Sequence, residues 1–489
     1  MPHRTPRAPH AALSPHPPLA LMLALMTLCG PLAPPLTASA TPAPPPAPPP
    51  APPSDRAWLG SYGRVGLSSD LEGGQGAARA ITPYAPRLIE DNYLELDAGY
   101  HAYDGREGKV DVITTLAALD ALMHYSGVSD ARLALRRAFV EARDLWGTPL
   151  WLSLGSRWLR GDDIYLMNFW PLDDLNTLGL TAGARGERYD SFLHVGVSRL
   201  ERSALAPQSQ RALVPAASGF GAEEAQLLNR QRLIIAAMYE RRYGGAEGMG
   251  WKWKLYGELH ALPSGERLLD GSYTERERVA DDRGLIIGAQ LGLWSMRHAR
   301  DYLNVWLRYA RGLAVYDELG APGSLSADLR AWPAEEWRAA MAGNHEWGKL
   351  SAQWGAYVRR YTDADAVARD FDDRVEGSVA LRPQLNLGLF TPAVEVSAQV
   401  SAPFGPHPRT LSGEAAVVYQ AALVPAITLA DPASVGPFTR PQLRLIYAVS
   451  SLNAAALARY AEADPRARSS TSHYLGARAE WWFGRGERY

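Results

Sequence analysis

"SHYLGARAEWWF", which runs from Ser472 to Phe483, alternates between two kinds of side chain. In a β-strand, successive side chains point to opposite faces. One face of this stretch is then entirely apolar and consists of Leu475, Ala477, Ala479, Trp481 and Phe483. The opposite face mixes charges with rings and consists of Tyr474, Gly476, Arg478, Glu480 and Trp482. The stretch therefore predicts a strand that separates an apolar environment from a wet one.

Several other segments show the same alternation, at 93–101, 251–261, 394–400, 442–450 and 302–309. In the last of these, Leu303, Val305 and Leu307 share one face. Asn304, Trp306 and Arg308 share the other. A soluble β-sandwich would alternate in this way too, with its apolar face inward and its polar face in water. Periodicity alone therefore leaves two folds open, the sandwich and the membrane barrel.

The composition narrows the classes of partner. The chain has 489 residues, a formal net charge of -2 and a pI near 6.6. Binding to nucleic acid would call for a basic surplus, which this chain lacks. Beyond the N-terminal region, no run of 18 apolar residues suggests a transmembrane helix. A transmembrane barrel is compatible with this, because its short alternating strands hardly raise the mean hydropathy.

The N-terminal region predicts export. An apolar run from Leu19 to Leu28 follows an Arg-containing start, and Ala38-Ser39-Ala40 provides a small-x-small cleavage site, so we assign 1–40 as a signal peptide. The only cysteine, Cys29, lies within that peptide, and the mature chain would have no disulfide. Residues 41–57 contain a Pro/Ala tract, which we interpret as a stiff linker. Residues 58–489 form the predicted barrel domain.

Export without cysteines, strand-like segments along the whole chain and aromatic residues at strand ends together favour the barrel. Rings at the ends of apolar faces are typical of the girdle at a membrane interface; here they are Tyr100, Trp251, Trp481 and Phe483. We therefore expect an all-β fold, a transmembrane antiparallel β-barrel of ~16–18 strands, with 18 preferred. Two segments do not fit the pattern. The stretch 114–143 has helical offsets and is interpreted as a strand end followed by a long loop, and 332–348 is interpreted as an exposed loop.

Four blocks of the sequence resemble the maltoporin family, the trimeric sugar-specific porins of Gram-negative outer membranes. These blocks are "GSYGRVGLS" (60–68), "PRLIEDNYLELDAG" (86–99), "AFVEARDLWGTPLWLSLGSRWLRGDDIYLMNFW" (138–170) and "GARAEWWF" (476–483). They occur in the order of the family and cover about a third of the mature chain. The resemblance implies an outer-membrane homotrimer that lets oligosaccharides diffuse along an aromatic slide and past a constriction loop that folds inward.

Carried over position by position, the resemblance implies three groups of residues in contact with the solute. The aromatic slide would comprise Tyr62, Tyr93, Trp482 and Trp306. The polar track would comprise Arg64, Arg87, Glu95 and Glu141. The constriction loop would contribute Arg160, Asp163, Asn168 and Trp170. The parity of the strands agrees independently for three of the rings, because Tyr93, Trp306 and Trp482 fall on the polar faces of their strands.

The chain departs from the family pattern at several positions. Val140 and Gly161 stand where the family has Arg, Asn168 where it has Asp, and Trp170 where it has Tyr. No Trp lies between Tyr125 and Phe139, and Leu387 occupies a slide position without a ring. A shorter slide weakens the case for maltodextrins while leaving the channel architecture intact.

Three other functions compete with a carbohydrate channel. A general porin, or a porin for another small solute, needs only the barrel. A soluble β-lectin needs only the alternation. A glycosidase is suggested by carboxylate pairs such as Asp162/Asp163 and Asp281/Asp282, but adjacent positions on a strand point in opposite directions. The sequence presents neither a nucleophile motif nor a His/Cys metal cluster, so we expect no enzyme activity, no metal and no cofactor.

Overall fold

The computed structural model describes residues 56–119, 131–200, 208–216, 218–244, 248–268, 275–367, 370–430 and 435–484. The predicted signal peptide and linker residues 41–55 lie outside the described residues. Ala57, which we assigned to the end of the linker, is the first residue of strand β1. Within the described residues, no helix is long and apolar enough to cross a membrane.

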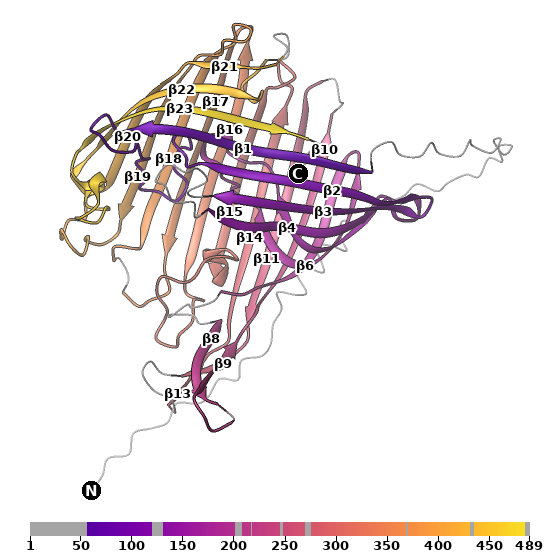
Figure 1. The fold of residues 1–489 in the computed structure, drawn as a ribbon, viewed down its shortest axis with the longest axis vertical. Coiled ribbons are helices and arrows are strands. Elements are labelled where there is room, and N and C mark those ends of the chain that lie inside the picture. The colour runs from indigo at the N-terminus through magenta and orange to yellow at the C-terminus, as the bar shows by residue number, and fades with distance from the viewer. Residues whose placement is uncertain are drawn as a thin grey trace, which may run out of the picture. The chain divides into compact units, whose positions relative to one another are not determined.

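Eighteen strands of the described residues form the wall of a closed antiparallel barrel (Figure 1). The first half of the wall consists of β1 (Ala57–Ser69), β2 (Tyr93–Gly105), β3 (Gly108–Leu119), β4 (Arg132–Arg143), β5 (Leu150–Arg160), β6 (Asp174–Gly186), β7 (Tyr189–Ser198), β10 (Arg232–Tyr243) and β11 (Gly250–Leu262). The second half consists of β14 (Asp282–Trp294), β15 (Tyr302–Gly312), β16 (Glu335–Trp347), β17 (Leu350–Thr362), β18 (Arg374–Leu385), β19 (Ala393–Pro403), β20 with β21 (Ala416–Val424 and Ala426–Thr428), β22 (Gln442–Leu452) and β23 (Thr471–Phe483).

Each wall strand pairs with the next along the chain, and the ring closes where the first strand meets the last. β20 and β21 both pair with β22, so they are two segments of one wall strand. β1 pairs with β2 on one side and with β23 on the other, in a register that sets Tyr62 opposite Trp482. A closed barrel leaves no free sheet edge, and the backbone N–H and C=O groups of every strand bond to the neighbouring strands, as a wall in lipid requires. The predicted barrel of 18 strands is confirmed.

The alternation predicted from the sequence is confirmed along β15 and along the other strands used to infer it. Leu307 is 55% exposed on the outer face, whereas its neighbours Trp306 and Arg308 are each 2% exposed on the inner face. Outward-facing rings lie near one end of the barrel, among them Trp251, Trp347 and Phe483. These positions suit an interfacial aromatic girdle.

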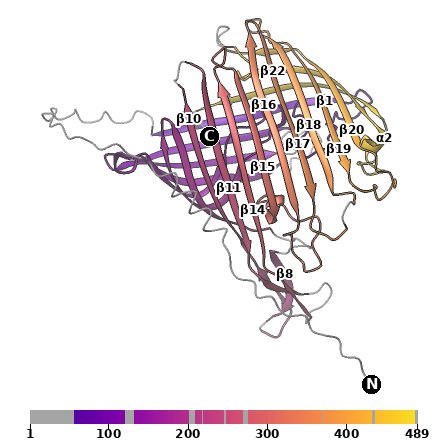
Figure 2. The ribbon, with the colours of Figure 1, turned by 180° about the vertical axis from the view of Figure 1, so that it is seen from behind.

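The two ends of the barrel differ in the length of their connections. At one end the strands are joined by short turns such as 105–108, 186–189 and 347–350. At the other end the connections are long, and two of them carry the hairpins β8–β9 (Ser209–Pro215 and Ala222–Asn229) and β12–β13 (Gly265–Leu268 and Arg276–Val279), which extend beyond the wall (Figures 1 and 2). This asymmetry is the usual one for outer-membrane barrels, with short turns on the periplasmic side.

The constriction loop, residues 161–173, folds into the barrel, as predicted. Its apolar side chains Ile164, Leu166, Met167, Phe169 and Leu172 are buried against residues that point inward from other strands. Two glycines make room for it. A Cβ atom on Gly355 would lie 2.2 Å from Cγ2 of Ile164, and a Cβ on Gly288 would lie 2.4 Å from Cδ1 of Leu172.

The β1–β2 connection also turns inward, which the sequence did not suggest. Tyr84 stacks on Phe169 of the constriction loop with ring centroids 3.7 Å apart, and the backbone N–H of Arg87 donates to the carbonyl oxygen of Leu166 at 2.8 Å. Leu88 and Ile89 pack against inward-facing residues of β19 to β23. Two connections thus occupy part of the lumen.

Two predictions of local structure were wrong. The segment 132–143 is strand β4 rather than a loop. The alternation did not reveal it, because a bulge opposite Thr115 and Leu116 inserts Arg136 as an extra residue and breaks the period of two. The segment from Glu335 to Trp347 is strand β16, whose alanines hid the apolar face, and its Trp337 packs on Tyr309 of β15 with centroids 4.7 Å apart.

Candidate functional site

Three of the four predicted slide residues lie together on the inner wall, where β1, β2 and β23 pair. The ring of Tyr62 lies 5.9 Å from that of Tyr93 and 6.5 Å from that of Trp482, measured between centroids. Trp482 is 37% exposed, whereas Tyr93 is largely covered. The closure of the barrel brings residues 62 and 482 together although they are 420 positions apart in the sequence.

Trp306, the fourth predicted slide residue, faces the lumen but is buried. It belongs to the apolar cluster formed by the constriction loop and the wall, and it is 2% exposed. A solute would have to move the constriction loop before it could touch this ring. Leu387 lies in the β18–β19 turn at the short-turn end, and the stretch 125–130 lies outside the described residues.

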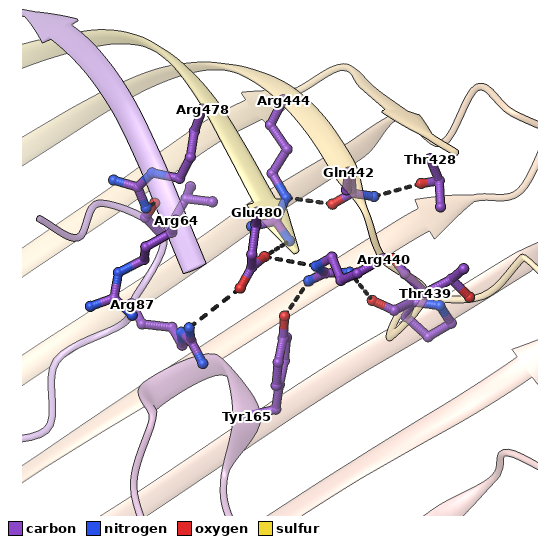
Figure 3. Close-up of polar contacts among 12 residues, drawn as sticks. Arg64, Arg87, Tyr165, Thr428, Thr439, Arg440, Gln442, Arg444, Arg478 and Glu480 are labelled. Carbon is purple, nitrogen blue, oxygen red and sulfur yellow. Dashed lines mark hydrogen bonds and ion pairs between the residues drawn. The ribbon is translucent and has the colours of Figure 1, made fainter. Parts of the chain in front are cut away.

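Arginines crowd around Glu480 beside the aromatic group (Figure 3). Arg440 donates to the Glu480 carboxylate at 2.8 Å, Arg444 contacts the same carboxylate, and Arg87 lies 3.5 Å from it. Arg64, on β1, lies 3.6 Å from the carboxylate of Glu90 in the β1–β2 connection. The predicted track residues Arg64 and Arg87 thus lie in one cluster, and both donate to the hydroxyl of Tyr62.

The other two predicted track residues lie further round the wall. Glu95 accepts from Tyr93 and lies 3.3 Å from the guanidinium of Arg136. Glu141, on β4, contacts Arg157 of β5. The four residues therefore extend from β1 to β4 and do not converge on one point.

The predicted constriction residues take up different places. Arg160 is the last residue of β5, contacts Asp174 and lies between the rings of Trp158 and Trp170. Asn168 is exposed and adopts a left-handed conformation with φ of 50°, which asparagine tolerates better than most residues. Asp163 lines a cavity of about 410 Å³ together with Tyr302 and Phe438.

Asp162 and Asp163, neighbours in the constriction loop, titrate differently. Burial raises the pKa of Asp163 to about 6, although Arg87 opposes this rise. Burial would also raise the pKa of Asp162, but Lys252 and Lys254 outweigh it and hold that pKa below its usual range. One carboxylate of the loop is therefore ionised at any ordinary pH, while the other changes its charge near neutrality.

A large cavity on the inner wall, about 780 Å³, is lined by residues of β1 to β7, β10, β11 and the constriction loop. Its lining includes the rings of Trp58, Trp151, Trp158 and Phe192. Ion pairs surround these rings. Two join neighbouring strands, Arg143 with Asp111 and Arg185 with Asp190, each at 3.0 Å; one lies within β10, Arg242 with Glu240 at 2.6 Å; and two join β11 to the constriction loop, Lys252 with Asp162 at 2.6 Å and Lys254 with Asp173 at 3.2 Å. Donors and acceptors thus alternate along the wall.

The sequence analysis did not predict most of these lining residues as site residues. The alternation at 251–261 places Lys252 and Lys254 on the polar face of their strand, and the same argument applied to β6, β7 and β10 would have found Arg185, Asp190 and Arg242. The partners of Arg143 and Arg185, however, follow from strand register, and those of Lys252 and Lys254 follow from the fold of the constriction loop; the alternation gives neither.

One group of carboxylates has the spacing of a metal site. Asp363, Asp365 and Asp370, in the β17–β18 connection, place ligand atoms within 4.8 Å of one another. Each accepts a hydrogen bond from a nearby backbone N–H, from Asp365, Val367 and Asp373 respectively. Such bonds are typical of turn formation by Asp, and they account for these residues without an ion.

The family model of the LamB porins matches residues 59–483. The chain belongs to the LamB porin family. Its barrel is therefore a channel in the outer membrane of a Gram-negative bacterium. The likeness to the maltoporin family inferred from four sequence blocks is confirmed at the level of the family.

Comparisons with individual proteins give more distant likenesses to this LamB porin. Similar solved structures include three from Pseudomonas aeruginosa, each aligned over 88% of this chain. OpdQ is 11% identical over 100% of its own chain with a TM-score of 0.42, OpdK with vanillate is 11% identical over 98% with a TM-score of 0.39, and OccK3 (OpdO) is 12% identical over 96% with a TM-score of 0.39. The comparison with curated proteins finds no match.

Proposed function

We propose that this LamB porin conducts carbohydrates, of the maltose or maltodextrin kind, by facilitated diffusion. The observation that carries the proposal is the contact between Tyr62, Tyr93 and Trp482 on the inner wall. A pyranose has an apolar C–H face that stacks on an aromatic ring and a rim of hydroxyls that need hydrogen bonds. The rings and the arginines beside them offer both surfaces in one place.

The ion-paired wall of the large cavity supports the same function. Arg and Lys donate to hydroxyls, and Asp and Glu accept from them. Because the charges are already paired, each contact with a neutral solute is weak. Weak contacts that repeat along the wall suit conduction, which requires sites that a solute can both enter and leave.

The test is the conductance of single channels in planar bilayers, titrated with a panel of sugars. Trp482→Ala should weaken the block of ion current by sugar about twofold to tenfold, since a stacked ring contributes about 0.5–1.5 kcal/mol. Leu475→Ala, on the outer face of the same strand, is the matched control and should leave the block unchanged. Unchanged block in Trp482→Ala would remove the slide assignment.

A channel for other small solutes is the second candidate, and the burial of Trp306 favours it. Only three of the predicted slide rings are grouped, so the slide is shorter than an extended oligosaccharide would use. In this case, ions and unrelated small solutes would pass with no concentration-dependent block by any sugar.

We also propose that the porin assembles as a homotrimer and is exported by the signal peptide in 1–40, with 41–57 as a linker. The trimer is the assembly that the resemblance to maltoporins implies. Chemical cross-linking in outer membranes, followed by denaturing electrophoresis, would show a band of three chains. N-terminal sequencing of the mature protein would locate the cleavage site.

A further inference from the structure

Guanidinium groups cover the faces of the aromatic rings on the wall from β1 to β5. Arg64 lies 6.0 Å from the ring centroid of Tyr62 and 5.0 Å from that of Tyr93. Arg136 lies 5.9 Å from the ring of Tyr93 and 4.5 Å from that of Trp158. Rings and cations therefore alternate, and each of these two arginines bridges two rings.

The alternation continues into the constriction. Arg160 lies 4.4 Å from the ring of Trp158 and 4.1 Å from that of Trp170. Arg136 takes part because it is the extra residue of the β4 bulge, which is a common device for redirecting a side chain. We call this series from Tyr62 to Trp170 the arginine–aromatic ladder.

The ladder sets a condition on any solute that stacks on its rings. Each ladder arginine already pairs with one carboxylate, Arg64 with Glu90, Arg136 with Glu95 and Arg160 with Asp174. A neutral pyranose that takes the place of such a guanidinium breaks a cation–π contact and adds only hydroxyls to the partners of the displaced cation. A pyranose with an anionic group stacks in the same place and offers the displaced guanidinium a charged, bidentate partner. The ladder should therefore bind a sugar that carries a negative charge more tightly than a neutral one.

The cluster around Glu480 adds an excess of positive charge beside the first ring of the ladder (Figure 3). Five guanidiniums, those of Arg64, Arg87, Arg440, Arg444 and Arg478, surround the carboxylates of Glu480 and Glu90. A third carboxylate, Asp163 of the constriction loop, also lies within the field of Arg87. Even with all three ionised, positive charge prevails there, and a lumen with low-dielectric walls focuses such a field.

We infer that the channel prefers pyranoses that carry an anionic group, such as uronates, over neutral sugars. This inference rests on the proposed carbohydrate function and changes the preferred substrate from neutral to anionic sugars. The shared chemistry is a sugar face for the ring together with a carboxylate or phosphate for the arginine.

The test compares four solutes as blockers of single-channel current at constant ionic strength: glucose, glucuronate, glucose 6-phosphate and succinate. Glucuronate or glucose 6-phosphate should block at a concentration about tenfold lower than glucose does, as expected for a gained charged hydrogen bond. The stronger of the two identifies whether carboxylate or phosphate is preferred. Succinate, which has charge but no sugar face, should block weakly.

Each other outcome has a distinct meaning. Equal block by glucose and glucuronate would overturn the preference for anionic sugars and leave the carbohydrate function standing. Block by succinate equal to that by glucuronate would overturn it as well, because the rings would then play no part. Block by none of the three sugars would remove both the inference and the proposed carbohydrate function.

Variants locate the preference on the ladder. Arg136→Gln and Arg160→Gln should each reduce the advantage of glucuronate over glucose severalfold, and Arg136→Lys should keep only part of it, since Lys lacks the planar fork. Arg276→Gln is the matched control, because it removes an exposed arginine of the β12–β13 hairpin that pairs with Glu266 at 3.6 Å. A glucuronate advantage that survives in Arg136→Gln, Arg160→Gln and the double variant would overturn the role of the ladder. The comparison of the four solutes on the unaltered protein holds whether or not the variants fold.

Discussion

The docking of the constriction loop yields a prediction with a definite magnitude. Ile164 is fully buried, and its Cγ2 atom occupies the space above Gly355 on β17. Replacing a buried Ile by Ala costs about 2–5 kcal/mol through lost burial and the cavity left behind. If that cost falls on the docked loop, the ratio of docked to undocked loop falls by about thirtyfold to a few thousandfold.

Single-channel recording should show the change directly. Ile164→Ala should add brief openings to higher conductance, because an undocked loop leaves the lumen wider. Ile287→Ala is the matched control: it removes the same atoms from an exposed, outward-facing side chain on β14 and should record like the unaltered channel.

A double-mutant cycle sharpens the test. In Gly355→Ala the new methyl group would overlap Ile164 at 2.2 Å and push the loop away, so this variant should also conduct more. In the double variant the methyl group partly fills the vacated space, and its conductance should lie closer to that of the unaltered channel than the sum of the two single effects predicts. Conductance and noise that do not change in Ile164→Ala, or strictly additive effects in the double variant, would refute the docking role of this contact.

Three further predictions concern charge and the narrow part of the lumen. Because the pKa of Asp163 is raised to about 6, lowering the pH from 7 to 5 adds a proton and removes a negative charge, so anion selectivity measured by reversal potential should rise; Asp163→Asn should be insensitive to this change. Glu480→Gln removes the carboxylate shared by Arg440 and Arg444 and should increase anion selectivity at every pH, and a reversal potential that stays the same would contradict the excess of positive charge. Phe438 lies 5.2 Å from Tyr165 and 6.3 Å from Tyr302, so Phe438→Ala should raise conductance, and no increase would place that ring outside the ion path.

The period of two predicted much of this fold because a barrel wall has two uniform surroundings. In β2, β11, β15 and β23 the outward side chains are mainly apolar and the charged side chains point inward, so parity alone assigned the faces correctly. The method failed where backbone geometry changes the parity. In β4 the extra residue Arg136 lies between Arg137, opposite Thr115, and Leu135, opposite Leu116, and the pattern then resembles a helix.

The candidate site was predicted only in part, because much of it depends on contacts distant in sequence. Parity and family resemblance found Tyr62, Tyr93 and Trp482. They could not reveal that Trp306 is buried in the apolar cluster of the loop and the wall, because the loop docks where glycines 288 and 355 of β14 and β17 make room for Leu172 and Ile164. The clustering of Arg440 and Arg444 around Glu480 depends on the register of β22 with β23, which no local pattern encodes.

The pairing of β1 with β23 has a consequence for biogenesis. From Ser61 opposite Phe483 to Ser69 opposite Leu475, the first strand finds its second neighbour only in the final stretch of the fold. A chain that ends before Thr471 therefore has two unpaired edge strands, and its seventeen remaining wall strands cannot form a closed barrel. The backbone groups on those two edges would be left without hydrogen-bond partners in lipid. The barrel can therefore close in the membrane only after β23 has been synthesised, so the last strand of the wall determines when the exported chain can become a pore.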